Sequence, residues 1–205
     1  MYADTQRETG LKAMSPAVRT ALGKVERHRL IPTEQQGAAY ANRPLPIGNG
    51  QTISQPYIVA LSADLLAPKA EHVVLEVGTG SGYQAAVLAE VVKRVHTIEL
   101  IEGLGRSAQQ RLQEMGYGNI DVRIGDGYAG WPENAPYDGI VVTAAAPQIP
   151  PALSAQLKPG GRMVIPVGAD GFIQYLKLVT KRADGGIDER EIIPVRFVPL
   201  VPALR

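Results

Sequence analysis

The chain has 205 residues, of which 45% are hydrophobic and 20% are charged, and this composition is typical of one globular domain. Its 21 basic and 20 acidic side chains leave a net charge of +1, so no global field favours nucleic acid or an anionic membrane. Cysteine is absent, which excludes disulfides, thiol nucleophiles and Cys-ligated zinc, and the three scattered histidines predict no metal site.

The first 70 residues hold two helical patterns joined by an irregular stretch. A helix is predicted from Ser15-Pro16 to Val25, with the serine as N-cap and the proline in the first turn. The turn-rich residues 32–54 form a long connection, and such connections are usually functional or disordered. Because this one contains large apolar side chains, we expect an ordered functional loop. A second helix is predicted to start near Ser54-Gln55-Pro56.

Residues 71–205 alternate short apolar runs with helical patterns. This alternation predicts an α/β fold with a mostly parallel sheet, right-handed crossovers and helices on both faces. A turn at 184–186 between two alternating segments predicts an antiparallel hairpin at the C-terminal end. A turn is also predicted at Lys158-Pro159-Gly160-Gly161, and Pro194 is expected at an edge or a bulge. The seven expected strands cover 72–77, 94–100, 120–124, 139–143, 162–167, 172–181 and a segment ending at Val198; the expected helices cover 83–92, 104–115 and 150–157.

A glycine-rich loop follows the first expected strand of this region and opens a helix, as a nucleotide or nucleoside site requires. Gly78, Gly80 and Gly82 allow backbone N–H groups to approach a ligand, and Ser81 with Gln84 fits a capping box. Tyr83 replaces the third glycine of the dinucleotide pattern, and no lysine follows as in a P-loop. A nucleoside without a pyrophosphate is therefore favoured, with a purely structural strand–helix turn as the alternative.

Three acidic residues end three successive expected strands, where the ligand crevice of an open α/β sheet lies. Glu99 stands about 20 residues after the glycine loop, where a carboxylate accepts hydrogen bonds from both ribose hydroxyls. Asp126 is a candidate acceptor for an adenine amino group, and the negative charge of Glu76 can attract an ammonium or sulfonium group. Each taken alone could be a solvated loop carboxylate or a helix cap. Together they point to S-adenosylmethionine.

This arrangement resembles the Rossmann-like class I methyltransferases, and one block narrows the resemblance further. Residues Pro44 to Tyr57, which contain Thr52-Ile53-Ser54-Gln55-Pro56, look like the signature of the protein-L-isoaspartate (D-aspartate) O-methyltransferase family. The resemblance covers about residues 15–200 and includes further blocks at 25–32, 74–83, 136–140 and 157–162. It implies a seven-stranded sheet, an N-terminal helical extension that covers substrate and cofactor (1–70), and a cofactor-binding core (71–205).

The resemblance also implies the reaction, which is methyl transfer from S-adenosylmethionine to the free carboxyl of an L-isoaspartyl, or D-aspartyl, residue in a damaged protein. The products are S-adenosylhomocysteine and an ester that collapses to a succinimide. Ser54 matches the active-site serine. The short C-terminal segment from Phe197 lacks the Thr and Gln that some members place over the cofactor, which leaves its role open. Cofactor contacts are expected from Thr52, Ile53, Glu76, Gly78, Thr79, Gly80, Ser81, Gly82, Glu99, Asp126 and Gly127.

The chemistry agrees with these residues, because a carboxylate with an ordinary pKa of about 3.9 is ionised at neutral pH and needs no general base. Ser54 can donate a hydrogen bond to it, although the same hydroxyl could instead cap the helix that begins at Pro56. His28 is a possible base, but beside Arg27 and Arg29 it is interpreted as part of a basic surface.

Two other functions remain open on the sequence alone. One is a methyltransferase for a small molecule or RNA, and the other is a binding domain that retains the loop without activity. The net charge gives RNA little support, and a pure binding module has no need of the block around Ser54. The polar N-terminus lacks the apolar core of a signal peptide, so we expect a cytoplasmic monomer that acts on proteins, with no nucleic acid or membrane partner.

Overall fold

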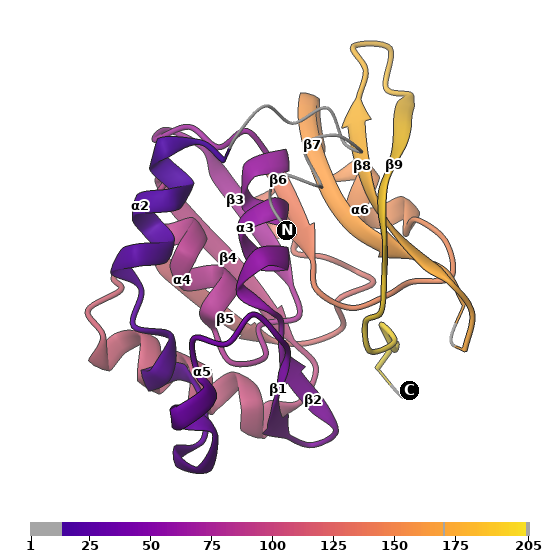
Figure 1. Cartoon of the computed structure of the whole chain (residues 1–205). Helices are drawn as coiled ribbons and strands as arrows, with labels where there is room; N and C mark the ends of the chain where they lie inside the picture. The colour runs from indigo at the N-terminus through magenta and orange to yellow at the C-terminus, as the bar shows by residue number, and fades with distance from the viewer. Residues whose placement is uncertain (1–13, 170, 204–205) are drawn as a thin grey trace.

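The computed structural model describes residues 14–169 and 171–203. Its centre is a seven-stranded sheet in the order β5-β4-β3-β6-β7-β8-β9. The first five strands of this order pair in parallel, and β8 and β9 add an antiparallel hairpin at one edge (Figure 1). This is the predicted fold class. The strands are β3 (Val73–Val77), β4 (Arg94–Glu99), β5 (Ile120–Ile124), β6 (Tyr137–Val142), β7 (Leu157–Val167), β8 (Gln174–Lys181) and β9 (Ile187–Val195).

Helices cover both faces of the sheet, as the alternation predicted. On β3, Val74 packs in one buried cluster while Leu75 packs in the other, because successive side chains of a strand point to opposite faces. The first cluster holds apolar residues of α2 (Pro16–Lys24), α3 (Pro56–Leu65), α4 (Tyr83–Ala89) and α5 (Glu102–Glu114), and the second holds Leu153 of α6 (Pro151–Ala155). None of the helices in the described ranges is long and apolar enough to cross a membrane.

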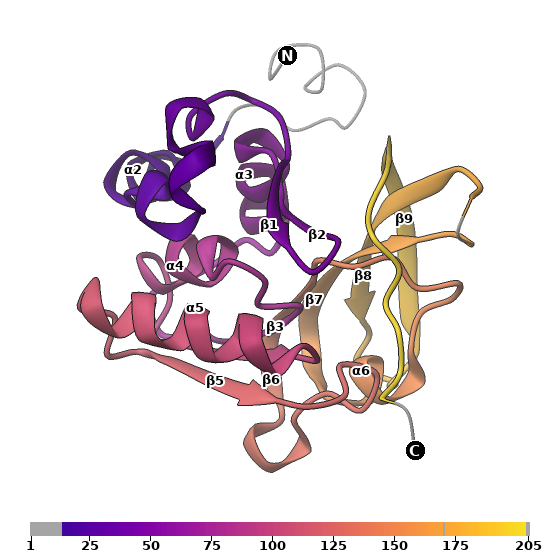
Figure 2. The ribbon, with the colours of Figure 1, turned by 90° about the horizontal axis from the view of Figure 1, so that it is seen from below.

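The predicted ordered loop at 32–54 has structure of its own. It contains the 3-10 helix Thr33–Ala38 and a two-stranded hairpin of β1 (Leu45–Gly48) and β2 (Gln51–Ile53), and another 3-10 helix, Arg27–Leu30, comes just before it. Leu45 and Ile53 are cross-strand partners and both are buried, so the hairpin is anchored in the core at its base. Figure 2 shows the hairpin beside α3. The predicted cap of α2 is also confirmed, because the Ser15 side chain accepts from Val18 N at 3.4 Å.

The residues predicted to turn at 158–161 lie inside β7 and form a bulge there instead of separating two elements. The pairing with β6 passes directly from Tyr137↔Leu157 to Gly139↔Arg162, and Gly160 has a φ of 79°. Gly161 permits the bulge, since a β-carbon there would lie 2.8 Å from the carbonyl oxygen of Lys158. Pro194 lies on β9, which is an edge strand, as expected.

Candidate active site

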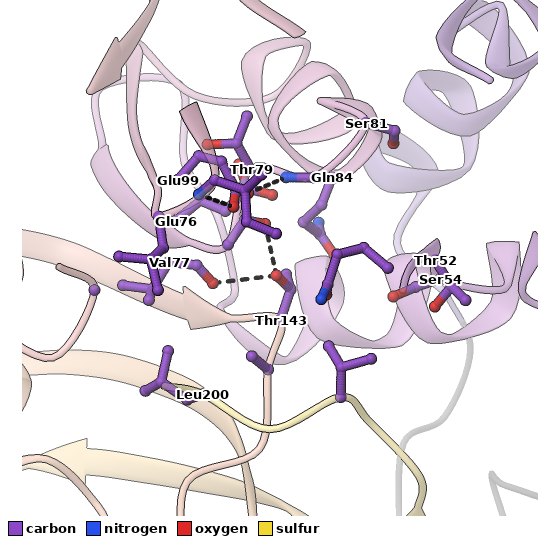
Figure 3. Close-up of a pocket in the computed structure, with 18 of the residues that line it drawn as sticks. Thr52, Ser54, Glu76, Val77, Thr79, Ser81, Gln84, Glu99, Thr143 and Leu200 are labelled. Carbon is purple, nitrogen blue, oxygen red and sulfur yellow. Dashed lines mark hydrogen bonds between the residues drawn. The ribbon is translucent and has the colours of Figure 1, made fainter. Parts of the chain in front are cut away.

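A pocket opens at the carboxyl ends of β3, β4 and β6, and three segments form its walls (Figure 3). The glycine loop, with Gly78 and Gly80, forms the inner wall. Residues 51–54 of the hairpin region and the segment after β9 form the outer wall. We call this segment after β9, residues 197–203, the strap. The pocket therefore joins the predicted cofactor loop and the predicted serine, which are far apart in the sequence. Thr52, Ile53, Ser54, Glu76, Gly78, Thr79, Gly80, Ser81, Glu99 and Gly127 line it, whereas Gly82 and Asp126 do not.

The glycine loop requires glycine for conformational and steric reasons. Gly78 has a φ of 97°, and a β-carbon there would collide with Oγ1 of Thr143. That hydroxyl donates to the carbonyl oxygen of Gly78 at 2.6 Å, which ties the loop to the end of β6. The predicted capping box is wrong, because the N-cap of α4 is Gly82 in the left-handed conformation and makes no side-chain cap. Ser81 instead accepts from the N–H of Tyr83 at 3.2 Å.

Glu99 bridges the glycine loop and the start of α5. Its Oε2 accepts from Gly80 N at 2.7 Å and its Oε1 accepts from Ile101 N at 3.0 Å. The side chain is almost fully buried, yet it lines the pocket. Both oxygens keep a lone pair free, because a carboxylate offers about four acceptor sites. The two oxygens therefore remain available to a ribose.

Glu76 is fully buried, and burial raises the pKa of its carboxyl to about 8. Its Oε2 accepts from the hydroxyl of Thr97 at 2.6 Å, and the Thr97 oxygen lies 2.7 Å from the hydroxyl of Thr79. Its Oε1 has no hydrogen-bond partner among the described residues. A buried polar atom without a partner is costly, so Oε1 is an acceptor available to a ligand.

Gln84 is a pocket residue that the sequence analysis missed as a ligand contact. It lies in the first turn of α4 and is 6% exposed, and its Nε2 also has no partner among the described residues. The wall therefore offers one unused acceptor, on Glu76, and one unused donor, on Gln84. In the sequence, Gln84 is a carboxamide just after the glycine loop. The local pattern predicts it only as the partner of Ser81 in a capping box and gives no sign of a role in binding.

Asp126 lies at the rim and holds backbone groups. Its Oδ1 accepts from Tyr128 N at 2.8 Å and its Oδ2 accepts from Ala203 N at 3.1 Å. The neighbouring Gly127 lines the pocket, and a β-carbon there would lie 2.5 Å from Cγ1 of Val77. The contact of Asp126 with an adenine stays a prediction. In the structure, the Asp126 carboxylate binds backbone N–H groups of the strap and of its own loop.

Ser54 follows β2 and faces the pocket from the outer wall, together with Thr52 (Figure 3). The interpretation of Ser54 as the helix cap is wrong. The N-cap of α3 is Gln55, and the helix has no side-chain cap. The hydroxyl of Ser54 is therefore not committed to the backbone of α3.

The strap, whose role the sequence left open, forms part of the outer wall, since Val198 to Val201 line the pocket. Its backbone is held by Ala145, whose N–H donates to Val198 O at 2.8 Å and whose carbonyl accepts from Leu200 N at 2.7 Å. The buried carboxamide of Gln174 holds Phe197 through two bonds of 2.6 and 3.2 Å. The strap thus lies across the pocket from the glycine loop (Figure 3).

The basic surface expected at 27–29 is wrong for Arg27, which is fully buried. Its Nε donates to Ala39 O at 2.7 Å. Arg29 is exposed and pairs with Glu26 at 2.9 Å. The Nδ1 of His28 lies 2.8 Å from the hydroxyl of Tyr40, away from the pocket-lining residues, so it is not placed as a base. In the described part of the chain, no group of His, Asp and Glu residues could hold a metal ion.

Comparisons with known proteins agree with this geometry. A family model described as protein-L-isoaspartate (D-aspartate) O-methyltransferase matches residues 4–204. Relatives named protein-L-isoaspartate O-methyltransferase include one from Polaromonas sp., 60% identical over 98% of this chain and 95% of its own length. Another, from Nitrosospira multiformis, is 61% identical over 98% of this chain and 85% of its own length.

Solved structures give the same fold. One named protein-L-isoaspartate O-methyltransferase superposes with a TM-score of 0.83 at 26% identity, covering 97% of this chain and 65% of that protein. A second is a putative enzyme of that name from Plasmodium falciparum in complex with S-adenosyl-L-homocysteine. It superposes with a TM-score of 0.78 at 23% identity, covering 98% of this chain and 96% of that protein. The sheet is therefore the Rossmann-like sheet of class I methyltransferases.

Proposed function

This chain belongs to the protein-L-isoaspartate (D-aspartate) O-methyltransferase family, and from that premise we propose how its pocket works. The enzyme is an S-adenosylmethionine-dependent carboxyl methyltransferase that repairs L-isoaspartyl residues in damaged proteins. The ester it forms collapses to a succinimide. One observation carries the assignment of residues: the glycine loop, Glu99 and Ser54 line a single pocket although they come from different parts of the chain.

We assign the inner wall to the cofactor, and its unsatisfied polar atoms support this. The free lone pairs of Glu99 suit the two ribose hydroxyls. The unpartnered Oε1 of Glu76 suits the ammonium of the methionine end, and the unpartnered Nε2 of Gln84 suits its carboxylate. The adenine end is assigned to the rim at Asp126 and Gly127. Of the other expected contacts, Gly78, Thr79, Gly80 and Ser81 shape the surface around the cofactor, and Thr52 and Ile53 border it from the outer wall. Gly82 does not line the pocket and is the N-cap of α4.

We assign the outer wall to the substrate. When bound, S-adenosylmethionine supplies a methyl group on a sulfonium, so that a carboxylate oxygen gains the methyl as the carbon–sulfur bond breaks and a neutral thioether leaves. The attacking carboxylate is already ionised, so the protein needs neither a general base nor a metal and must only align it. The Ser54 hydroxyl donates to one carboxylate oxygen and fixes the other toward the methyl. The hairpin and the strap exclude water around this contact.

The first experiment offers two peptides that differ only in an isoaspartyl or an aspartyl residue, together with labelled S-adenosylmethionine. We expect label in the isoaspartyl peptide alone. Equal labelling of both peptides, or labelling of RNA or a small molecule instead, would contradict the function.

The second experiment tests the role of Ser54. We expect Ser54→Ala to lower kcat by about tenfold to a hundredfold, since a hydrogen bond to a charged group contributes roughly 1.5–3 kcal/mol. Binding of S-adenosylhomocysteine should not change. Ser154→Ala, at a half-buried serine of α6 that donates to Pro151 O and does not line the pocket, is the matched control and should behave as wild type. Equal losses of turnover and cofactor binding would show that Ser54 only shapes the pocket.

We further propose that the region 1–70 acts as the cover of substrate and cofactor, that 71–205 is the cofactor-binding core, and that the enzyme works as a cytoplasmic monomer on polypeptides. The near-neutral charge supports a substrate that can be almost any aged protein rather than a nucleic acid. Sedimentation of the purified enzyme tests the monomer, and fractionation of cells tests the compartment.

A further inference from the structure

Arg27 is a buried cation that the proposed mechanism does not use. Its side chain is fully buried, and burial lowers the pKa of its guanidinium. Within residues 14–169 and 171–203, no carboxylate forms an ion pair with it, and neither Nη1 nor Nη2 has a hydrogen-bond partner. Removing a charge from water without a counter-ion is costly. Stability of the fold is therefore a poor reason for a charged residue at this position.

The guanidinium has one large contact, and it leads to the pocket. The Cζ of Arg27 lies 4.6 Å from the ring centroid of Tyr83, within the range of a cation–π interaction. Tyr83 is 3% exposed, lines the pocket and is the first residue of α4. Its N–H donates to Ser81 in the glycine loop. Arg27 thus contacts the residue at which the loop becomes a helix.

A second contact fixes the guanidinium from the other side of the chain. The Nε of Arg27 donates to Ala39 O at 2.7 Å, and Ala39 is itself buried just before the hairpin. Arg27 therefore connects the N-terminal region, which carries the outer wall, with the start of the helix that carries the inner wall. A planar guanidinium can donate and stack at the same time, which the ammonium of a lysine cannot.

We propose that Arg27 is a positioning residue for the cofactor pocket and that it acts through the ring of Tyr83. It holds the junction of the glycine loop and α4 in the shape that binds S-adenosylmethionine. The proposal rests on the proposed cofactor site. The proposal predicts that cofactor affinity and stability of the fold respond differently when Arg27 is replaced. Removal of a buried charge without a counter-ion should leave the fold stable, whereas it should loosen the junction and weaken cofactor binding.

The test compares Arg27→Met and Arg27→Lys with Arg29→Met, the exposed neighbour that pairs with Glu26. Binding of S-adenosylhomocysteine is measured by calorimetry, stability by Tm, and turnover with the isoaspartyl peptide. We expect Arg27→Met to weaken binding by about tenfold and to raise the cofactor KM similarly, with kcat and Tm close to wild type. Arg27→Lys should lose the same affinity, and Arg29→Met should change nothing.

A double-mutant cycle then tests the route through the ring. Tyr83→Leu, which removes the ring, should bind weakly. Adding Arg27→Met to Tyr83→Leu should cause no further loss. Wild-type affinity in Arg27→Met or Arg27→Lys, or additive losses in the double variant, would overturn the proposal. A wild-type enzyme that fails to bind S-adenosylhomocysteine would instead overturn the proposed function.

Discussion

The two walls of the pocket are built differently. The inner wall is buried and held by side chains: Glu76 is 0% and Glu99 is 7% exposed, and each accepts a hydrogen bond of 2.6 or 2.7 Å. The outer wall is more open, with Val201 47% exposed, and the strap is held mainly by bonds to its backbone. A rigid wall suits a ligand that never changes, namely the cofactor. An open wall suits polypeptides of many sequences.

The largest effect is expected at the inner wall from Gly78→Ala. The new β-carbon would collide with Oγ1 of Thr143 and would hold a side chain at a φ of 97°. We expect binding of S-adenosylhomocysteine to fall by about a hundredfold, because strain and collision together cost roughly 3 kcal/mol. Gly103→Ala, in an open position of α5, is the matched control. Unchanged binding in Gly78→Ala would mean that the inner wall is not rigid.

A smaller loss is expected from Glu99→Ala at the same wall. The variant removes both proposed ribose acceptors and the bonds to Gly80 and Ile101. We expect calorimetry to show binding weakened by about thirtyfold. Glu102→Ala, at an exposed carboxylate that pairs with Arg106, should bind as wild type. If Glu99→Ala matched that control, the ribose assignment would be wrong.

Two buried glutamines allow the outer wall to be tested alone. Gln174 holds Phe197 of the strap through both atoms of its carboxamide, and Gln156 holds Ala129 and Trp131 in the same manner, each at 2.8 Å. We expect Gln174→Leu to raise the peptide KM by about tenfold, because each lost bond contributes roughly 0.5–1.5 kcal/mol. Gln156→Leu loses two bonds of the same kind, so it should lower the free energy of unfolding by roughly 0.5–1.5 kcal/mol for each bond, but it should leave the peptide KM unchanged. Equal KM values would show that the strap does not shape the substrate side.

The smallest effect concerns pH and again the inner wall. Because the pKa of Glu76 is raised to about 8, its carboxyl holds a proton at pH 7 and must lose it to attract an ammonium fully. The α-amino group of the cofactor loses its own proton with a pKa of about 7.7–8.0, so cofactor affinity should rise by about two- to threefold from pH 7 to pH 8 and fall at higher pH. Calorimetry in buffers of different ionisation enthalpy should detect proton release on binding. Glu76→Gln should abolish both effects, and a pH-independent affinity in the wild type would contradict the assignment.

The same carboxyl predicts how stability depends on pH. The folded-state pKa lies above the ordinary value of 4.5, so the folded protein binds the proton more tightly than the unfolded chain does. This contribution is fully present below pH ~4.5 and is lost as the pH rises toward about 8, at most about 1.4 kcal/mol per pH unit. Urea unfolding of wild type and Glu76→Gln across this range measures the difference in slope.

The sequence predicted what depends on local pattern. The apolar runs of β3 to β6 marked the parallel strands, and the glycines placed the cofactor loop. It failed where a residue's role depends on distant partners. Arg27 reads as a surface cation beside His28 and Arg29 until Tyr83 folds against it. The bulge at Gly161 could not be told from a turn, because only the pairing with β6 distinguishes them.

The strap gives the order of residues along the chain a biosynthetic meaning. It follows β9, the last strand of the sheet, and returns to bridge Ala145 after β6 and close the pocket. A chain emerging from the ribosome therefore acquires every strand of the sheet before the segment that completes the site. A variant without the strap would retain every strand of the sheet and lose part of the outer wall, so the sheet and the finished pocket depend on different stretches of the chain.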